Sequence, residues 1–331
     1  MTRKEIVKRS VHFQNPPRLP RFWFYGREED SDAVMVHLRK WYDGPTQKEA
    51  ELGFTWLQNS SDHMTMGIPE NYPLKDWDNF DHYVQSVLPN PYAPDRFDEF
   101  DSKDFGDRYV IGDLYLSGFT SMWLVRSFDE VFYDMAEEPE QLEQLADVIF
   151  ENEMEIIRQC PAHGIDCIGF ADDIGMQNGM MMSPETWRKY FKERLHKQFD
   201  LCHELGMDVY FHTCGYVAPV LDDLVEIGVD ILDLGQIYLN DVEDISRRFC
   251  GRVCFSQPID YQTVGLSGTK EEIYAEAKYL MDKLLNESGG VIAKLCDYEQ
   301  HDYKAIPGNT MLTRNAFVEQ DPYLNQSFNR K

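Results

Sequence analysis

The segment His212-Thr213-Cys214 is the part of the sequence whose residue types point most directly to chemistry. It follows the apolar run Asp208 to Phe211, which has the composition of a β-strand. In an extended chain, residues two positions apart point to the same side, so the imidazole and the thiol could reach one ion. Zinc prefers thiolate and imidazole ligands, and a catalytic zinc site keeps one position open for a substrate. Cys296, after another apolar run, could supply a third ligand, although free cysteines are often simply buried.

Two aspartates and several other side chains follow predicted strands in the same way. Asp172 and Asp173 come directly after the apolar run Ile165 to Phe170. Either could act as a general acid or orient His212, and paired acids at a helix entry are also common as plain caps. The residues that we expect to contact a substrate are Trp23, Tyr25, Gln177, Gln236 and Gln257. An aromatic residue such as Trp23 suits an aromatic or methylated substrate, with core packing an equal alternative.

These residues are brought together if the chain alternates strands and helices. The second half does so: helices are predicted at 139–159, 183–205, 217–227, 241–249 and 270–285, and strands at 165–170, 208–211, 230–234, 252–256 and 290–295. Short connections between them imply parallel strands. Five such units in about half the chain favour a closed (β/α)₈ barrel, in which the carboxyl ends of the strands face the active site. No glycine-rich phosphate fingerprint follows a strand, which argues against a Rossmann fold.

The whole chain, residues 1–331, is predicted to form a single barrel domain. Residues 1–20 form a helical lead-in that ends in a Pro-rich break, and the first strand lies within 21–26. Residues 76–107 are polar, aromatic and Pro-bearing, and we expect them to form a long loop or a lid.

Composition limits the partners. The chain has 58 acidic and 32 basic residues, a net charge of −26, which repels nucleic acids and anionic membranes, and we expect neither as a partner. The N-terminus lacks the apolar segment of a secretory signal, and no apolar run is long enough to span a bilayer. The seven cysteines are scattered and odd in number, so we expect reduced thiols and a cytoplasmic location.

Several motifs resemble those of the uroporphyrinogen-decarboxylase superfamily. They are Gly169-Phe-Ala-Asp-Asp-Ile-Gly-Met-Gln177, Ser183-Pro-Glu-Thr-Trp-Arg-Lys-Tyr-Phe191, His212-Thr-Cys-Gly215, Gly228-Val-Asp-Ile-Leu-Asp233, Gly289-Gly-Val-Ile292 and Ile306-Pro-Gly-Asn309. The resemblance covers most of the chain. It is strongest between residues 165 and 317, and it implies a (β/α)₈ barrel.

The resemblance also separates two branches of the superfamily. Uroporphyrinogen decarboxylase itself uses no metal, has an arginine-rich first loop and carries a histidine near the last strand. Here that loop holds Arg27 followed by Glu28-Glu29-Asp30, and Cys296 stands near the expected histidine. The zinc methyltransferases, including corrinoid-dependent coenzyme M methyltransferases, carry His-x-Cys and a distant Cys, which match His212, Cys214 and Cys296. They often add a Glu after the next strand, where this chain has Gly235-Gln236, so Asp172, Asp173 or water would complete the metal sphere.

The resemblance to that branch implies a zinc-dependent methyltransferase. It would move a methyl group between a small methylated substrate or thiol and a corrinoid (cobalamin) carried on a partner protein. The alternative is a metal-free decarboxylase or lyase that acts on a small carboxylate through Asp172 or Asp173. A third hypothesis is a non-catalytic protein that binds a corrinoid or another small molecule.

Overall fold

Eight parallel strands form a nearly closed barrel in the computed structural model, which describes residues 1–24, 28–43, 48–57, 68–137, 140–296 and 305–325. Their order is β1-β12-β11-β10-β9-β8-β7-β2, and the two end strands also contact each other. The strands are β1 (Arg21–Trp23), β2 (Ala33–His37), β7 (Tyr109–Asp113), β8 (Cys167–Ala171), β9 (Asp208–Thr213), β10 (Ile231–Leu234), β11 (Cys254–Gln257) and β12 (Val291–Leu295). The predicted (β/α)₈ barrel is confirmed.

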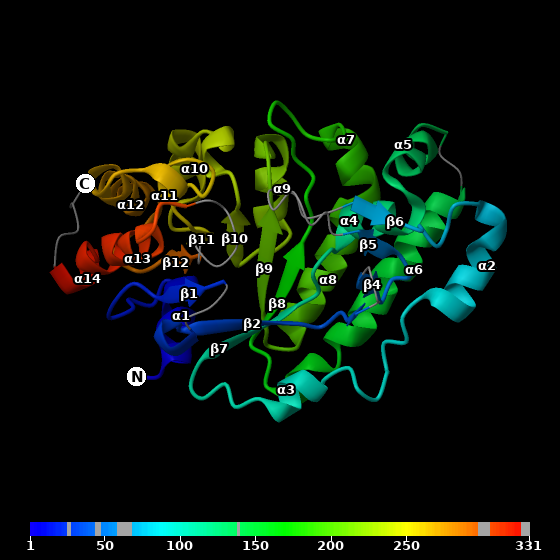
Figure 1. Cartoon of the computed structure of the whole chain (residues 1–331), viewed down its shortest axis with the longest axis horizontal. Helices are drawn as coiled ribbons and strands as arrows, with labels where there is room; N and C mark the ends of the chain where they lie inside the picture. The colour runs from blue at the N-terminus through cyan, green and yellow to red at the C-terminus, as the bar shows by residue number, and fades with distance from the viewer. Residues whose placement is uncertain (25–27, 44–47, 58–67, 138–139, 297–304, 326–331) are drawn as a thin grey trace.

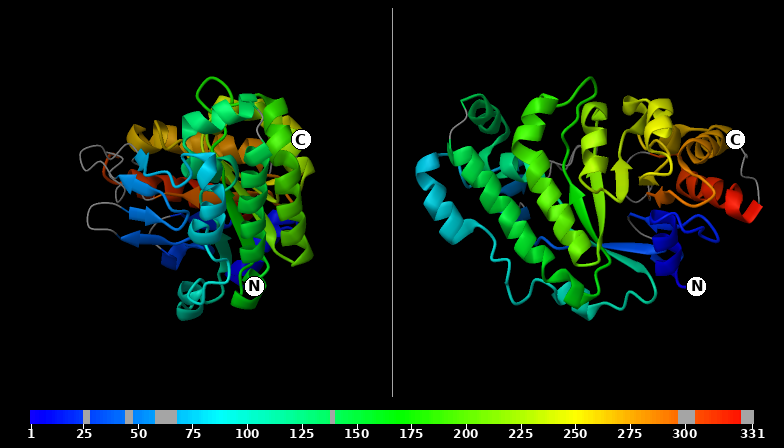
Figure 2. Two further views of the ribbon diagram at one scale, coloured as in Figure 1. Left: turned by 90° about the vertical axis from the view of Figure 1, so that its right-hand side faces the viewer. Right: turned by 180° about the vertical axis from the view of Figure 1, so that it is seen from behind.

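Helices surround this sheet (Figures 1 and 2). They are α1 (Arg3–Val11), α4 (Gly118–Arg126), α5 (Phe128–Glu137), α6 (Glu140–Ile157), α7 (Pro184–Trp187), α8 (Glu193–Glu204), α9 (Leu221–Glu226), α10 (Val242–Phe249), α11 (Val264–Ser267), α12 (Lys270–Leu284), α13 (Asn309–Glu319) and α14 (Pro322–Asn325). The helix expected over 183–205 contains a π-helical stretch, Arg188–Lys192, between α7 and α8. Within the described residues, no helix has the length and apolar character needed to cross a membrane.

The buried apolar residues divide into two layers, as the alternation of side chains along a strand requires. The inner layer fills the barrel and comprises Val7, Val11, Phe22, Ala33, Tyr109, Ile111, Cys167, Tyr210, Ile231, Cys254 and Ile292. Helix α1 therefore closes the amino-terminal end of the barrel with Val7 and Val11. The larger outer layer lies between the strands and the helices, and it includes Trp23, the neighbour of the inward-facing Phe22.

A long excursion separates β2 from β7. It contains an antiparallel sheet of β3 (Trp41–Asp43), β4 (Lys48–Ala50), β5 (Thr55–Leu57) and β6 (Ile68–Glu70), followed by the short helices α2 (Phe80–His82) and α3 (Asp98–Ser102). The sequence patterns did not predict this sheet. Residues 76–107, expected to form a loop or lid, make up the second part of the excursion and carry these short helices.

Asp172, directly after β8, holds the loop between β7 and α4. Its carboxylate is fully buried and accepts hydrogen bonds from the backbone N–H groups of Phe119 and Thr120 and from the Thr120 hydroxyl, at 2.9–3.1 Å. These are the unpaired donors at the start of α4, so Asp172 caps that helix from another part of the chain. Burial raises the pKa of Asp172 to about 7, although the three donors oppose this. The geometry matches the capping alternative for this residue.

Replacing Asp172 with alanine should therefore destabilise the fold. We expect the free energy of unfolding to fall by about 2 kcal/mol, because the donors at the start of α4 stay buried without a partner. Urea denaturation followed by circular dichroism measures this. Asp173→Ala is the matched control: its side chain is 38% exposed, and we expect a loss below about 1 kcal/mol. Equal losses in the two variants would contradict the capping role.

Candidate active site

Three potential metal ligands meet at the carboxyl end of β8 and β9. The Nε2 atom of His212 lies 3.6 Å from the sulfur of Cys214 and 3.9 Å from Oδ1 of Asp173. One ligand atom from each residue lies within 4.8 Å of the other two. Asp173 is held in place by the backbone N–H of Cys214, which donates to its Oδ1 at 2.8 Å. All three side chains are partly exposed, so a small molecule can reach them.

The separation of these atoms fits a tetrahedral zinc ion. Bond lengths near 2.0–2.1 Å to nitrogen and 2.3 Å to sulfur place two such ligands about 3.6 Å apart. The Nε2–Sγ distance of His212 and Cys214 has this value, and the oxygen of Asp173 stands slightly farther out. The donor set of one imidazole, one thiol and one carboxylate is also chemically suited to zinc.

The other nitrogen of His212 is fixed by a buried carboxylate inside the barrel. Oδ2 of Asp233 lies 2.9 Å from Nδ1 of His212 and accepts hydrogen bonds from the Tyr210 hydroxyl and the Lys294 ammonium, both at 2.5 Å. A carboxylate behind the imidazole selects the tautomer with hydrogen on Nδ1, which leaves Nε2 free to bind a metal. Burial opposes the charge of Asp233, but Lys294 and His212 hold its pKa below the usual range.

Cys296 faces the same interior but is not a member of the three-residue group. It follows β12, two positions after Lys294, so alternation directs both side chains inward. Burial raises the pKa of Cys296 to about 11, and the charge of Lys294 opposes this rise. Within the described residues, the group that could hold a metal ion joins Asp173, expected from the sequence as a catalytic acid, to His212 and Cys214, and Cys296 lies outside that group.

Tyr261, in the loop after β11, approaches the same sulfur. Its hydroxyl lies 3.7 Å from Sγ of Cys214. Gly235 makes this contact possible: a Cβ atom there would stand 2.7 Å from the Tyr261 hydroxyl and 2.8 Å from the Cys214 sulfur. Burial and the neighbouring Cys214 raise the pKa of Tyr261, so its hydroxyl keeps its proton and can donate it in a hydrogen bond.

The loops that carry these groups are locked together by close backbone contacts. Tyr216 donates from its backbone N–H to the carbonyl of Met176 at 2.8 Å. A Cβ atom on Gly215 would stand 2.3 Å from the carbonyl carbon of Gly175, so only glycine permits this crossing. Gln236 braces the same loop, because its Oε1 accepts from the backbone N–H of Gly215 at 2.8 Å.

The residues predicted to contact a substrate differ in burial and in their position in the fold. Trp23 lies in the outer apolar layer, which matches its core-packing alternative. Gln257 is buried, and its Nε2 donates to the carbonyl of Pro258 at 3.0 Å. Gln177 is exposed in the loop after β8. Tyr25, and Arg27 beside it, lie outside the described residues.

Sequence patterns missed several polar residues inside the barrel. Asp233 and Lys294 lie within strands that were predicted, but functional groups were expected only at the ends of those strands. A charged residue inside an otherwise apolar strand was the available signal. His37 and Asp113 end β2 and β7, which were not predicted.

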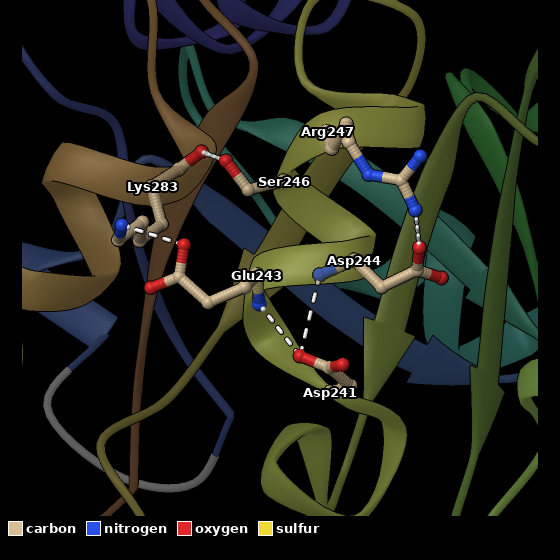
Figure 3. A pocket seen from close by; sticks show the side chains of 6 residues that line it. All are labelled: Asp241, Glu243, Asp244, Ser246, Arg247 and Lys283. Atoms are coloured by element: carbon tan, nitrogen blue, oxygen red, sulfur yellow. Dashed lines mark hydrogen bonds and ion pairs between the residues drawn. The ribbon is translucent and has the colours of Figure 1, made fainter.

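A surface pocket lies apart from this centre, on the outer side of α10 (Figure 3). It is lined by Asp241, Glu243, Asp244, Ser246, Arg247 and Lys283. Its charges pair with one another: Lys283 binds Glu243 at 2.7 Å, and Arg247 binds Asp244. Asp241 caps α10 through the backbone N–H groups of Glu243 and Asp244. These contacts account for the charged groups of the pocket without a ligand.

Gly235→Ala tests the close packing around the Cys214 sulfur. We expect the free energy of unfolding to fall by about 1–3 kcal/mol, because the added methyl overlaps Tyr261 and Cys214. Gly179→Ala, in the loop after β8, is the control: nothing lies within 4 Å of its added Cβ, and stability should hardly change. The two variants are compared by urea denaturation, and equal stability of both would refute the tight contact.

Comparisons with known proteins agree with this architecture. The sequence profile of uroporphyrinogen decarboxylase (URO-D) matches residues 110–297. No curated protein sequence matches the chain. Among solved structures, a methyltransferase from Methanosarcina mazei has a TM-score of 0.62 and 16% identity, over 97% of this chain and 99% of that chain.

Two other barrels are more distant. A Bacillus subtilis mannanase has a TM-score of 0.46 and 11% identity, over 95% of this chain and 91% of that chain. The IOLI protein with a bound zinc atom has a TM-score of 0.39 and 9% identity, over 77% and 87%. At 16% identity, the Methanosarcina mazei structure shows a shared fold. The sequence profile covers residues 110–297 of the 331. Because this match spans more than half of the sequence, the chain belongs to the uroporphyrinogen decarboxylase family.

Proposed function

We propose that the protein is a zinc-dependent methyltransferase that moves a methyl group between a small substrate and a corrinoid carried on a partner protein. The observation that carries this proposal is the pair His212 Nε2 and Cys214 Sγ, 3.6 Å apart at the barrel mouth with Asp233 behind the imidazole. A barrel with this donor pair at its carboxyl end can hold a Lewis acid where substrates bind. The fold shared with the Methanosarcina mazei methyltransferase is consistent with the proposal.

Zinc would be held by His212 and Cys214 together with a third group, for which the chain offers Asp173 and Cys296. Asp173 is the nearer, and Cys296 offers the softer thiolate. Bound there, zinc would polarise the heteroatom of a methyl donor or lower the pKa of an acceptor thiol.

The protein's own residues would orient the reaction around this ion. Asp233 and Lys294 fix the His212 ring from inside the barrel. The Tyr261 hydroxyl, beside the Cys214 sulfur, can donate a hydrogen bond to an atom that binds in the open position. If Cys296 completes the zinc site, Asp173, which is more than a third exposed, is free to exchange a proton with a thiol or a leaving group.

The metal-free lyase is the weaker candidate. It needs Asp172 or Asp173 to stabilise a protonated intermediate, but the Asp172 carboxylate is buried and engaged by three donors of α4. Asp173 alone remains accessible for that chemistry.

Metal analysis tests the proposal directly. Protein purified without chelator should contain about one zinc per chain, and His212→Ala and Cys214→Ser should each lose it. Asp173→Asn and Cys296→Ser should each weaken zinc affinity, by about 10–100-fold for a residue that binds or supports the ion. Competition with a chromogenic chelator measures these affinities.

Cys250→Ser serves as the control, because Cys250 follows α10, and its thiol donates to the carbonyl of Leu284 at 3.4 Å. It should keep the wild-type zinc content. Zinc-free wild-type protein, or full zinc in Cys214→Ser, would refute the metal centre. Asp233 and Cys214 outweigh the effect of burial and raise the pKa of His212, so zinc must displace a proton there. Zinc affinity should therefore fall as the pH is lowered.

A further inference from the structure

A second polar pair, His37 and Asp113, lies at the barrel mouth on strands other than those that carry the candidate metal ligands. His37 ends β2 and Asp113 ends β7, and the two residues are paired in register. Alternation directs both inward: Ala33 and Ile111, four and two positions earlier, belong to the inner apolar layer. Both side chains therefore point into the barrel at its carboxyl end, where substrates of this fold bind.

The geometry of the pair leaves one nitrogen available. Nδ1 of His37 lies 3.0 Å from Oδ2 of Asp113, which is buried. The other carboxylate oxygen of Asp113 accepts from the backbone N–H of Tyr115 at 3.2 Å. The His37 side chain is 45% exposed, and its Nε2 has no hydrogen-bond partner among the described residues. Asp113 thus holds the ring while Nε2 remains open to a ligand.

The loop after β7 is strained in a way that supports this arrangement. Tyr115 and Leu116 have φ angles of 40° and 62°, in the left-handed region that residues with side chains rarely adopt. In this conformation the Tyr115 ring lies against the His37 ring, with centroids 5.2 Å apart. The conformation is held by Ser121, which donates to the Leu116 carbonyl, and by Ser117, which donates to Ala171 at 2.9 Å. Backbone strain of this kind persists where a site requires it.

The pair stands apart from the metal ligands around the barrel. In the strand order, β7 and β8 separate β2, which carries His37, from β9, which carries His212. The charges of Asp113 and of Glu99 in α3 both raise the pKa of His37 and so favour the protonated imidazole. Among the described residues, Lys294 is also directed into the barrel, and it is already paired with Asp233. His37 therefore offers a positive charge at the mouth that a ligand can reach.

We infer that His37, held by Asp113, binds a carboxylate on the substrate, so that the substrate is a small methyl-bearing carboxylate with its acid group at β2 and its methyl-bearing atom at β9. The methyl-donor part of this inference rests on the proposed function; the carboxylate site does not. Protonated His37 donates from Nε2 to a carboxylate oxygen, and the adjacent Tyr115 ring provides an apolar face for the substrate body.

The inference has a definite pH dependence. The hydrogen bond with Asp113 raises the pKa of His37 above its usual value of 6.5, although burial opposes this. Neutral His37, with hydrogen on Nδ1, presents only a lone pair at Nε2 and cannot donate to a carboxylate. Carboxylate affinity should therefore be full below this raised pKa and be lost as the pH rises through it.

Calorimetric titration with benzoate and its neutral isostere benzamide tests the site on the purified protein. At pH 6 we expect wild-type protein to bind benzoate about tenfold more tightly than benzamide, since a charge-assisted hydrogen bond is gained. His37→Gln should remove this preference, and Asp113→Asn should move its pH midpoint downward. His196→Gln is the matched control, because His196 of α8 is 44% exposed and paired with Asp200. It should keep the preference.

Failure of the carboxylate site can be distinguished from failure of the proposed methyl transfer. The same titration on zinc-free Cys214→Ser should keep the benzoate preference, so absence of zinc refutes the methyl transfer but not the carboxylate site. With zinc bound and a reduced corrinoid, cob(I)alamin, supplied as the methyl acceptor, 4-methoxybenzoate should be converted to 4-hydroxybenzoate and methylcobalamin in preference to 4-methoxybenzamide. His37→Gln should raise KM for the acid alone. Equal affinity of wild-type protein for benzoate and benzamide, absence of benzoate binding, or an unchanged preference in His37→Gln would overturn the inference.

Discussion

A single buried carboxylate, Asp233, organises the interior of this barrel. It lies on β10 in register with His212 of β9, and it receives the Tyr210 hydroxyl, the His212 imidazole and the Lys294 ammonium on one oxygen. A charge at this depth is costly unless it is paired and hydrogen-bonded. Two groups on the neighbouring strand β9 and one on β12 bind Oδ2 of Asp233, which offsets much of that cost and fixes the orientation of the imidazole. Its Oδ1 is buried without a hydrogen-bond partner among the described residues.

The candidate metal ligands lie above an apolar layer inside the barrel. The amino-terminal half is filled by apolar side chains and closed by Val7 and Val11 of α1. Above them, Lys294 lies over the ring of Phe24, with Nζ 4.4 Å from the ring centroid, and is bound to Asp233. An apolar floor excludes water from beneath the network, which strengthens each of its electrostatic contacts. The accessible candidate ligands, His212 and Cys214, lie above this network at the barrel mouth.

Alternation along strands was the rule that made part of the site predictable. It brought His212 and Cys214 together correctly, because two residues spaced by one in a strand share a side. The same rule explains Trp23: Phe22 faces the interior, so Trp23 must face the helices. Asp173 was expected from the sequence as an acid. Its position beside His212 and Cys214 depends on the hydrogen bond from the backbone N–H of Cys214, which forms only when the loops after β8 and β9 are folded. The eight strands were inferred from the regular alternation of strands and helices in the second half of the chain. The family resemblance was inferred from motifs between residues 165 and 317, and the family profile overlaps this region.

The first half of the chain was harder to predict for physical reasons. The excursion between β2 and β7 builds its own antiparallel sheet, so the regular alternation of strands and helices is interrupted there. His37 and Asp113 were therefore not recognised as strand ends, although their residue types suit a binding site.

Charge balance links the two sides of the mouth. On one side, Lys294 offsets Asp233, so that His212 is oriented by a carboxylate without an unbalanced negative charge beneath the ligands. On the other side, Asp113 meets His37, and the imidazole there has no second carboxylate bound to it among the described residues. The buried pair is closed, because both of its members are inaccessible, whereas the His37 ring is almost half exposed. A protein with a net charge of −26 repels anions in general, so a carboxylate can bind only where a local cation is both fixed and accessible. His37 meets both conditions, and this makes the acidity of the whole chain compatible with an anionic substrate.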